Sequence, residues 1–270
     1  MERIGNKELL QNINKLNMEI WEMEMALLDK NWVSGNISSS FTRVYVMLEG
    51  EAHIKNGKRE ICMLPGNVYI VPAGMEFSYK CDDYAKKLYF HISVLMPDGY
   101  DLFNRFSDFI VFENQDVSGA DRMFRERTVS NIVNVKSYIY DIICKCLDGC
   151  ETEQLHSYSE LIRGTIDYID KNLSAMLTVD MIAEKMFVSV SKLQKSFKTE
   201  IGTPIGKYID DRLMFVAEKE IRISSKSVKE ISDMLGYCDQ FYFSRLFSKK
   251  YGIAPLKYRK ICKKGEVVVD

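Results

Sequence analysis

The sequence has few of the residues that build metal centres and disulfide frameworks. Its 270 residues include seven cysteines, no Cys-x-x-Cys pair, and three histidines, which are His53, His91 and His156. An odd number of scattered cysteines indicates reduced thiols, because small disulfide scaffolds carry a closely spaced even set. The densest cysteine cluster, within residues 144–150, has no nearby histidine to complete a zinc site. We therefore expect neither a metal nor a cofactor.

Long apolar runs are also missing. No stretch reaches the roughly 18 consecutive apolar residues of a membrane-spanning helix, so we expect no membrane association. The first residues show no apolar segment followed by a cleavage site, which predicts no secretory signal and a cytoplasmic location.

The charge is unevenly divided along the chain. Residues 157–270 hold 20 Lys and Arg against 15 Asp and Glu, whereas residues 1–156 hold 17 against 23, which gives the net charge of −1. A basic C-terminal part fits the phosphate backbone of a nucleic acid. The same small excess also fits an ordinary solvated surface, so charge alone does not decide.

Residues 41–94 have the texture of short strands separated by turn signals such as Asn56-Gly57 and Pro65-Gly66. The expected strands are 43–48, 51–54, 59–64, 68–71, 77–80 and 87–94. Their regular spacing predicts an antiparallel barrel or jelly roll. Residues 1–32 are amphipathic and favour no single assignment.

The pattern becomes helical after about residue 100. Residues 134–147 repeat apolar side chains every three to four positions, and the polar stretch that follows predicts a linker at 149–156. Ser157 and Glu160 have capping-box spacing, which predicts that a new helix starts there.

Residues 178–259 contain an internal repeat with an offset of 50 residues. The matched pairs are Ser189 with Asp239, Leu193 with Phe243, Phe197 with Phe247, Gly202 with Gly252, and Tyr208 with Tyr258. Each copy predicts a short helix, a turn, a second helix capped by Ser189 or Asp239, and a glycine stop. The apolar stripe of residues 205–222 predicts one long helix between the copies. Two helix-turn-helix units on one rigid helix would place two helices in successive major grooves.

The second copy, residues 236–259, resembles the signature of the AraC/XylS family of transcription regulators. The first copy is similar to it through Ala183, Leu193, Phe197, Gly202, Tyr208, Arg212 and Ala217. The resemblance spans about residues 158–260, and its two departures, Ser232 and Cys238, are small side chains. It implies sequence-specific binding to double-stranded DNA, and contact with RNA polymerase if the protein is an activator.

The resemblance also implies which side chains face DNA. They are Val190, Ser191, Gln194 and Lys195 in the first copy, and Gln240, Phe241, Tyr242 and Arg245 in the second. Gln suits adenine and Arg suits guanine in the major groove. Arg245 also fits a phosphate contact, and Phe241 fits either a thymine methyl group or packing within its own domain.

The strand-rich part resembles the cupin-like sensor domain of the same family. Residues 66–77 match the second cupin motif, except that Phe77 stands where the motif has histidine, and residues 39–43 lack the His-x-His of the first motif. Because the metal ligands are missing, we expect a sensor and not an enzyme. The barrel mouth could hold a small effector, with Arg43, Tyr45, Glu76, Tyr79 and His91 as the expected pocket. A ligand-free barrel that only dimerises is the alternative.

The helix at 134–147 resembles the dimer-forming helix that follows the barrel in the family. Its stripe of Val135, Tyr138, Ile139 and Ile142 suits a seam in a homodimer, and equally suits packing on its own barrel. Two DNA-binding domains in one dimer would raise the effective concentration at paired sites.

The sequence thus predicts an α+β chain of several domains. Residues 1–148 form a cupin-like sensor and dimerisation domain, 149–156 a linker, and 157–262 an all-α domain of two helix-turn-helix units joined by a long helix. We expect a transcription regulator controlled by a small ligand or by dimer rearrangement. A cupin-type enzyme and a helical protein-interaction module are the competing classes.

Overall fold

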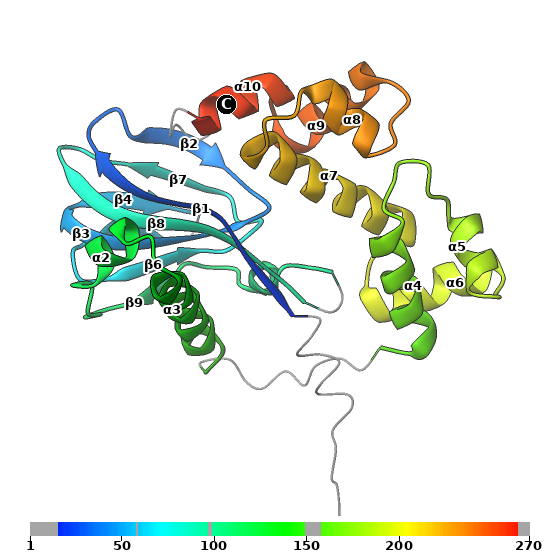
Figure 1. The fold of residues 1–270 in the computed structure, drawn as a ribbon, viewed down its shortest axis with the longest axis horizontal. Coiled ribbons are helices and arrows are strands. Elements are labelled where there is room, and N and C mark those ends of the chain that lie inside the picture. The colour runs from blue at the N-terminus through cyan, green and yellow to red at the C-terminus, as the bar shows by residue number, and fades with distance from the viewer. Residues whose placement is uncertain (1–15, 58, 97–98, 149–157, 264–270) are drawn as a thin grey trace, which may run out of the picture.

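The computed structural model describes residues 16–57, 59–96, 99–148 and 158–263. A β-rich N-terminal part with two trailing helices is followed by an all-helical C-terminal part, which confirms the predicted α+β architecture (Figure 1). The predicted linker, residues 149–156, lies outside the described residues.

The N-terminal part consists of two antiparallel sheets. One has five strands in the order β1-β8-β3-β6-β9, and the other has four in the order β2-β7-β4-β5. The strands are β1 (Asn17–Leu28), β2 (Val33–Ile37), β3 (Thr42–Gly50), β4 (Ala52–Lys55), β5 (Glu60–Met63), β6 (Val68–Val71), β7 (Phe77–Lys80), β8 (Ala85–Leu95) and β9 (Ile110–Phe112).

The six expected strands correspond to β3 through β8. Three strands were not predicted, and β1 is the most consequential, since it pairs with β8 along its whole length. A bulge between Ile20 and Glu22 shifts the register of β1, so its inward side chains do not follow one unbroken period of two.

Because side chains point alternately to the two faces of a sheet, β3 contributes to two separate hydrophobic cores. Val44 and Val46 point to the outer face of the five-stranded sheet, whereas Tyr45 and Met47 point between the two sheets. All four are buried. Phe77, where a metal-binding cupin would have histidine, is fully buried in the inter-sheet core. There it serves as an apolar core side chain.

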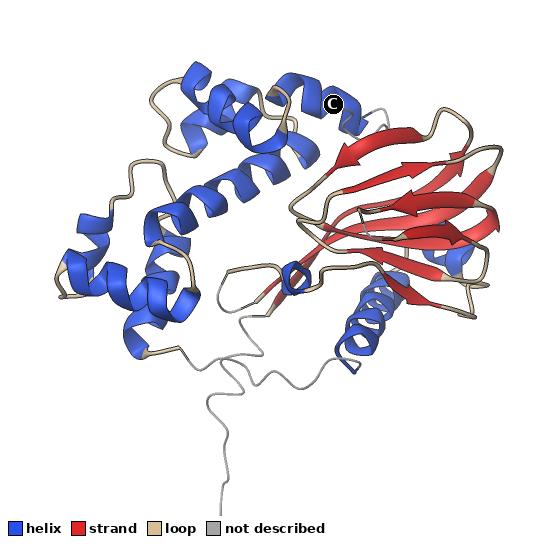
Figure 2. Cartoon of the chain, turned by 180° about the vertical axis from the view of Figure 1, so that it is seen from behind, coloured by secondary structure: helices blue, strands red, loops and turns tan. Residues whose placement is uncertain are grey.

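Helices α2 (Ala120–Arg125) and α3 (Val129–Asp148) cover the outer face of the five-stranded sheet (Figure 2). The stripe expected to form a dimer seam lies against this sheet. Val135, Ile139 and Ile142 are buried there, and Tyr138 packs on Phe90 with ring centroids 6.2 Å apart. Their place in the chain's own core corrects the expectation that these four side chains form a seam, because a seam needs a free face.

Seven helices of the described residues form the C-terminal part around one core. They are α4 (Glu160–Lys171), α5 (Val179–Lys185), α6 (Val190–Ile201), α7 (Ile205–Ile223), α8 (Val228–Met234), α9 (Gln240–Tyr251) and α10 (Pro255–Lys263). The predicted core residues Leu193, Phe197, Phe243 and Phe247 are fully buried in it. The predicted long helix, 205–222, is α7.

The helix caps predicted within the repeat are confirmed. The start predicted for the helix before the repeat differs from the one observed. The Ser189 and Asp239 side chains accept backbone N–H groups at the starts of α6 and α9, and Gly202 and Gly252 end these helices with φ of 80° and 79°. Helix α4 instead begins after Ser159, which accepts the Ile162 N–H. The predicted cap, Ser157, lies outside the described residues, and Glu160 is the first residue of the helix.

The turns of the two units differ by one residue. Phe187 and Gly236 occupy the same place, two residues beyond the last residue of the helix, and both are left-handed with φ of 55° and 78°. They are 49 residues apart, whereas the caps Ser189 and Asp239 are 50 apart. The offset of 50 therefore holds from the caps onward, and the second turn has one extra residue.

Candidate nucleic-acid interface and ligand cavity

Helix α6 presents a polar face to solvent because its other face is pinned in the core. Leu193 and Phe197 are fully buried, one turn apart. Ser191, Gln194 and Lys195, which lie between and beside them on the helix, are exposed, and Val190 is half-buried. Three of the four side chains expected to face DNA in this unit are thus free to reach a ligand.

Helix α9 has the same arrangement with more aromatic character. Phe243 and Phe247 are buried, while Phe241 and Tyr242 are 77% and 49% exposed. The Arg245 side chain is exposed, with its guanidinium carbon 5.9 Å from the Tyr242 ring centroid. Gln240 is half-buried. This face therefore offers a guanidinium and two aromatic rings to a partner.

Helix α7 sets the separation of the two units, which lie at its two ends (Figure 1). Its 19 residues span about 28 Å at about 1.5 Å per residue. Successive major grooves on one face of DNA lie about 34 Å apart. A rigid connector of this length suits two units that enter neighbouring grooves.

Helix α7 also docks on the N-terminal part of the chain. Arg222 forms an ion pair with Glu22 of β1, and Lys219 pairs with Glu19 of the same strand. The Arg222 guanidinium also lies 4.6 Å from the Phe41 ring centroid. The helix that spaces the two units thus carries basic side chains that hold it to the sheet.

An aromatic contact and two hydrogen bonds complete this junction. Trp21 packs edge-on against Phe215 of α7, with centroids 5.2 Å apart. Arg212 donates to the Gly99 carbonyl at 3.0 Å, and the Ser40 backbone N–H donates to the buried Glu218 carboxylate at 3.3 Å. The two parts of the chain therefore meet through specific side chains.

Glu22 connects this junction to the interior of the barrel. Its carboxylate accepts a hydrogen bond from His91 Nδ1 at 2.7 Å as well as from Arg222. Burial works to raise the pKa of Glu22, but these two partners outweigh it and lower the pKa to about 2. Burial, and then Arg222, hold the pKa of His91 well below its usual value, so this histidine is neutral. Its Nδ1 lies within hydrogen-bond distance of both the Glu22 carboxylate and the Arg222 guanidinium.

A cavity of about 660 Å³ opens where α7 and α10 meet the two sheets. Four of the five expected pocket residues line it, namely Arg43, Tyr45, Tyr79 and His91. Lys87, Tyr89 and Trp32 line it too, together with Arg222, Tyr258 and Ile261 from the helical part. The cavity is thus walled by both parts of the chain.

Glu76 lies elsewhere. Its exposed side chain lines a second hollow of about 510 Å³, between Ser38–Ser40 and the start of α7. The five residues expected to form one pocket are therefore divided, because Glu76 lies in the turn before β7 and lines a different hollow from the other four.

Lys87 is one of several cavity residues that were not predicted from the sequence. It is 3% exposed, and its ammonium lies 3.5 Å from the Tyr45 ring centroid and 4.1 Å from that of Trp32. A signal was present in the sequence. Residues 87, 89 and 91 are Lys, Tyr and His, while the alternate positions 88, 90 and 92 are apolar, so the period of two places this lysine on the inner face.

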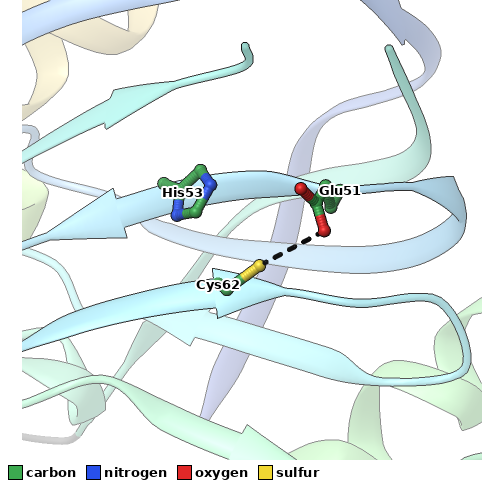
Figure 3. Close-up of side chains that lie close together, drawn as sticks. All are labelled: Glu51, His53 and Cys62. Atoms are coloured by element: carbon green, nitrogen blue, oxygen red, sulfur yellow. Dashed lines mark hydrogen bonds between the residues drawn. The ribbon is translucent and has the colours of Figure 1, made fainter. Parts of the chain in front are cut away.

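Figure 3 shows a group of three donor side chains on β4, β5 and the preceding turn, where Glu51, His53 and Cys62 lie within 4.8 Å of one another. Cys62 donates to the Glu51 carboxylate at 3.9 Å. Burial and the neighbouring Glu51 charge raise the pKa of the Cys62 thiol, which disfavours the thiolate that binds a metal. We interpret the group as polar pairing across two strands.

The comparisons agree with this arrangement. Residues 182–261 match the family described as a helix-turn-helix domain. The regulatory protein SoxS of Salmonella typhimurium is 32% identical over 103 residues, which are 38% of this chain and 96% of SoxS. The lactose operon transcription activator of Staphylococcus xylosus is 21% identical over 233 residues, 80% of this chain and 82% of the relative.

A solved structure of ToxT from Vibrio cholerae, bound to an unsaturated fatty acid, covers 92% of this chain and 97% of its own with a TM-score of 0.56. At 11% identity this likeness shows the fold alone. It extends over both the β-rich part and the helical part.

Paired helix-turn-helix units, together with these relatives, define a sequence-specific DNA-binding regulator of transcription. The chain belongs to the AraC/XylS family of transcription regulators. No helix among the described residues has the length and apolar character needed to span a membrane.

Proposed function

We propose that this regulator reads DNA through the outward faces of α6 and α9 and is controlled by a small ligand in the barrel cavity. The observation that carries the first half is the pair of capped helices whose buried faces leave polar side chains exposed at both ends of α7. The residues proposed to contact DNA are Val190, Ser191, Gln194, Lys195, Gln240, Phe241, Tyr242 and Arg245.

The proposed division of the chain is a sensor and dimerisation domain at 1–148, a linker at 149–156 and a DNA-binding domain at 157–262. The near-complete coverage of SoxS by 103 residues supports the last of these as a unit. The relatives are regulators, and we propose no catalytic role for this chain. We also propose that it acts in the cytoplasm.

Ligand control is supported by the position of the cavity. Because Arg222 and Ile261 of the helical part share its wall with Arg43 and Lys87 of the sheets, a bound molecule would contact both parts. A ligand can shift the arrangement of the two parts only if it binds one arrangement more tightly than another. The fatty acid in the ToxT structure supports an organic ligand in a protein of this fold.

We propose that the protein acts as a homodimer through the outer face of α3. Its inner face is occupied, but Val129, Val133, Tyr140 and Leu147 form an exposed stripe at helical spacing, with Ile132 beside it. Pairing this stripe with a second copy would cover apolar surface and bring two DNA-binding domains together. If the regulator is an activator, as the lactose operon relative is named, RNA polymerase is a further partner.

Selection from random duplex DNA by the full chain tests the DNA-reading half of the proposal. We expect enrichment of a site with two recognisable segments about one helical turn apart. Enriched sites should survive competition from nonspecific DNA when the salt concentration is raised, whereas pure phosphate binding would fall steeply and equally for all sequences. Failure to enrich any sequence would contradict base reading by α6 and α9.

A further inference from the structure

Two basic side chains are buried in the cavity wall with no acidic partner. Lys87 and Arg43 are each 3% exposed, and neither forms an ion pair with any residue that the structure describes. Both project from the inner face of the five-stranded sheet, on the neighbouring strands β8 and β3. Buried charges are costly unless they are paired, so this arrangement needs an explanation.

The contacts that these two cations do make are incomplete. The Lys87 ammonium is surrounded by the rings of Trp32, Tyr45 and Tyr89, whose faces offset part of its desolvation but carry no net charge. Arg43 donates to the Ser39 hydroxyl, and its Nε has no partner. Burial and the proximity of Arg43 hold the pKa of Lys87 well below its usual value.

Each acidic group that lines the cavity has a partner other than Lys87 or Arg43. Glu22 is held by His91 and Arg222, Glu24 accepts the Tyr89 hydroxyl at 2.8 Å, and Asp29 accepts the Asn31 backbone N–H at 2.8 Å. The remaining cation of the helical part at this cavity, Lys257, is exposed. The carboxylates of this cavity thus pair with groups other than Lys87 and Arg43, which leaves these two buried cations without a counter-charge among the described residues.

We propose that this cavity binds a small organic anion, a carboxylate or a phosphate ester on an apolar or aromatic body, with Lys87 and Arg43 holding the anionic group. The inference rests on the proposed ligand control and names its chemical class. The planar guanidinium of Arg43 suits two oxygens of such a group, and Lys87 adds a point charge. The rings of Trp32, Tyr45 and Tyr89 suit the body, and the cavity volume lies within the range usual for small-molecule sites.

Calorimetric titration of the full-length protein with matched pairs of molecules tests the charge directly. The anions are octanoate, cinnamate and phenyl phosphate, and their neutral counterparts are octanamide, cinnamamide and phenol. We expect at least one anion to bind about tenfold or more tightly than its neutral counterpart, as for a lost charge-assisted hydrogen bond. Which anion binds best distinguishes an aliphatic acid, an aromatic acid and a phosphate ester.

A pair of lysine variants assigns the effect to the cavity. Lys87→Met removes the buried ammonium with little loss of volume and should weaken binding of the anion about tenfold or more. Lys86→Met is the matched control, since Lys86 is the next residue of β8 and pairs with the exposed Glu49 outside the cavity. Lys87→Met should melt at the wild-type temperature or above, because replacing an unpaired buried charge with an apolar side chain of similar size does not cost stability. Lys86→Met should melt close to the wild-type temperature, since it removes only a solvent-exposed ion pair.

Three results would overturn the anion site. They are equal binding of anions and neutral counterparts, wild-type affinity in Lys87→Met, and no binding of any of the three anions. None of them affects the selection of DNA sites by the full chain. A neutral molecule that changed DNA binding would retain ligand control and remove only the anionic class.

Discussion

Replacing Arg222 with methionine should weaken the docking of α7 on the N-terminal sheet. Arg222 is the helical-part partner of Glu22, and its side chain is 10% exposed. The methionine keeps the apolar stem that packs near Phe41 and removes the charge. Glu22 is then left with two partners from its own sheet, His91 and the Tyr89 hydroxyl, so the loss falls on the contact between the two parts.

The pKa of Glu22 bounds the size of the effect. Burial alone would raise this pKa, but His91 and Arg222 lower it from 4.5 to about 2. At about 1.4 kcal/mol for each pKa unit, the charged form gains about 3 kcal/mol over the protonated form. His91 belongs to the same sheet, and the Glu22 side chain is 19% exposed. We therefore assign about 1–2 kcal/mol to the Arg222 contact across the junction.

Trp21 provides the assay. The chain has two tryptophans, so Trp32→Phe leaves Trp21 as the single emitter. Trp21 is 8% exposed and packs on Phe215 of α7, so separation of the two parts should shift its emission to the red. A loss of 1–2 kcal/mol should lower the urea midpoint of this shift by about 0.5–1 M. Glu22→Gln and the double variant complete a cycle with a coupling of about 1–2 kcal/mol.

The matched control is Lys207→Met, which removes a cation from an exposed position of the same helix. It should leave the midpoint unchanged. Identical midpoints for Arg222→Met and Lys207→Met, or a coupling energy near zero, would refute the reasoning.

Four further predictions follow from the same structure. Because the pKa of Glu22 is depressed, docking is fully stabilised above about pH 4.5 and is lost as the pH falls toward about 2; Trp21 emission against pH checks this, and Glu22→Gln should flatten the profile. Arg245→Ala should relax preference at one base pair by about 1–3 kcal/mol, measured by competition among single-base operator variants, while equal weakening for all sequences would make Arg245 a phosphate contact. Phe247→Ala should cost about 3–5 kcal/mol in the unfolding of the helical part, since this fully buried ring packs on Phe243, Tyr251 and Tyr258. Phe187→Gly should stabilise the same part by about 1 kcal/mol in urea, because Phe187 is 94% exposed at φ 55°, and destabilisation would show that its ring makes a contact that matters.

The helical part was predictable in detail because its signals are local. Ser189, Asp239, Gly202 and Gly252 act on backbone groups within a few residues, so their spacing alone locates the ends of α6 and α9. The capping box of Ser227 and Glu230 at the start of α8 is a local signal of the same kind. What the pattern did not reveal was the extra residue in the second turn.

The junction between the two parts could not be predicted from local patterns. Glu22 and Arg222 are 200 residues apart, and nothing near either one signals the other. The bulge in β1 removed the alternation that would have placed Glu22 on an inner face. Lys87 was within reach, since its strand alternates cleanly, but charged residues are assigned to solvent by default.

The single helix between the two units limits how the sequence can change in evolution. Each residue of α7 advances the chain by about 1.5 Å and turns it by about 100°. An insertion between Tyr208 and Arg222 would rotate the second unit out of phase with its groove and, in the same step, carry Arg222 away from Glu22. The length of α7 therefore sets both the alignment of the two units with the DNA grooves and the contact between α7 and the N-terminal part. We expect related proteins to differ in the DNA sequence that they recognise and in their ligand, while the number of residues in this helix stays fixed.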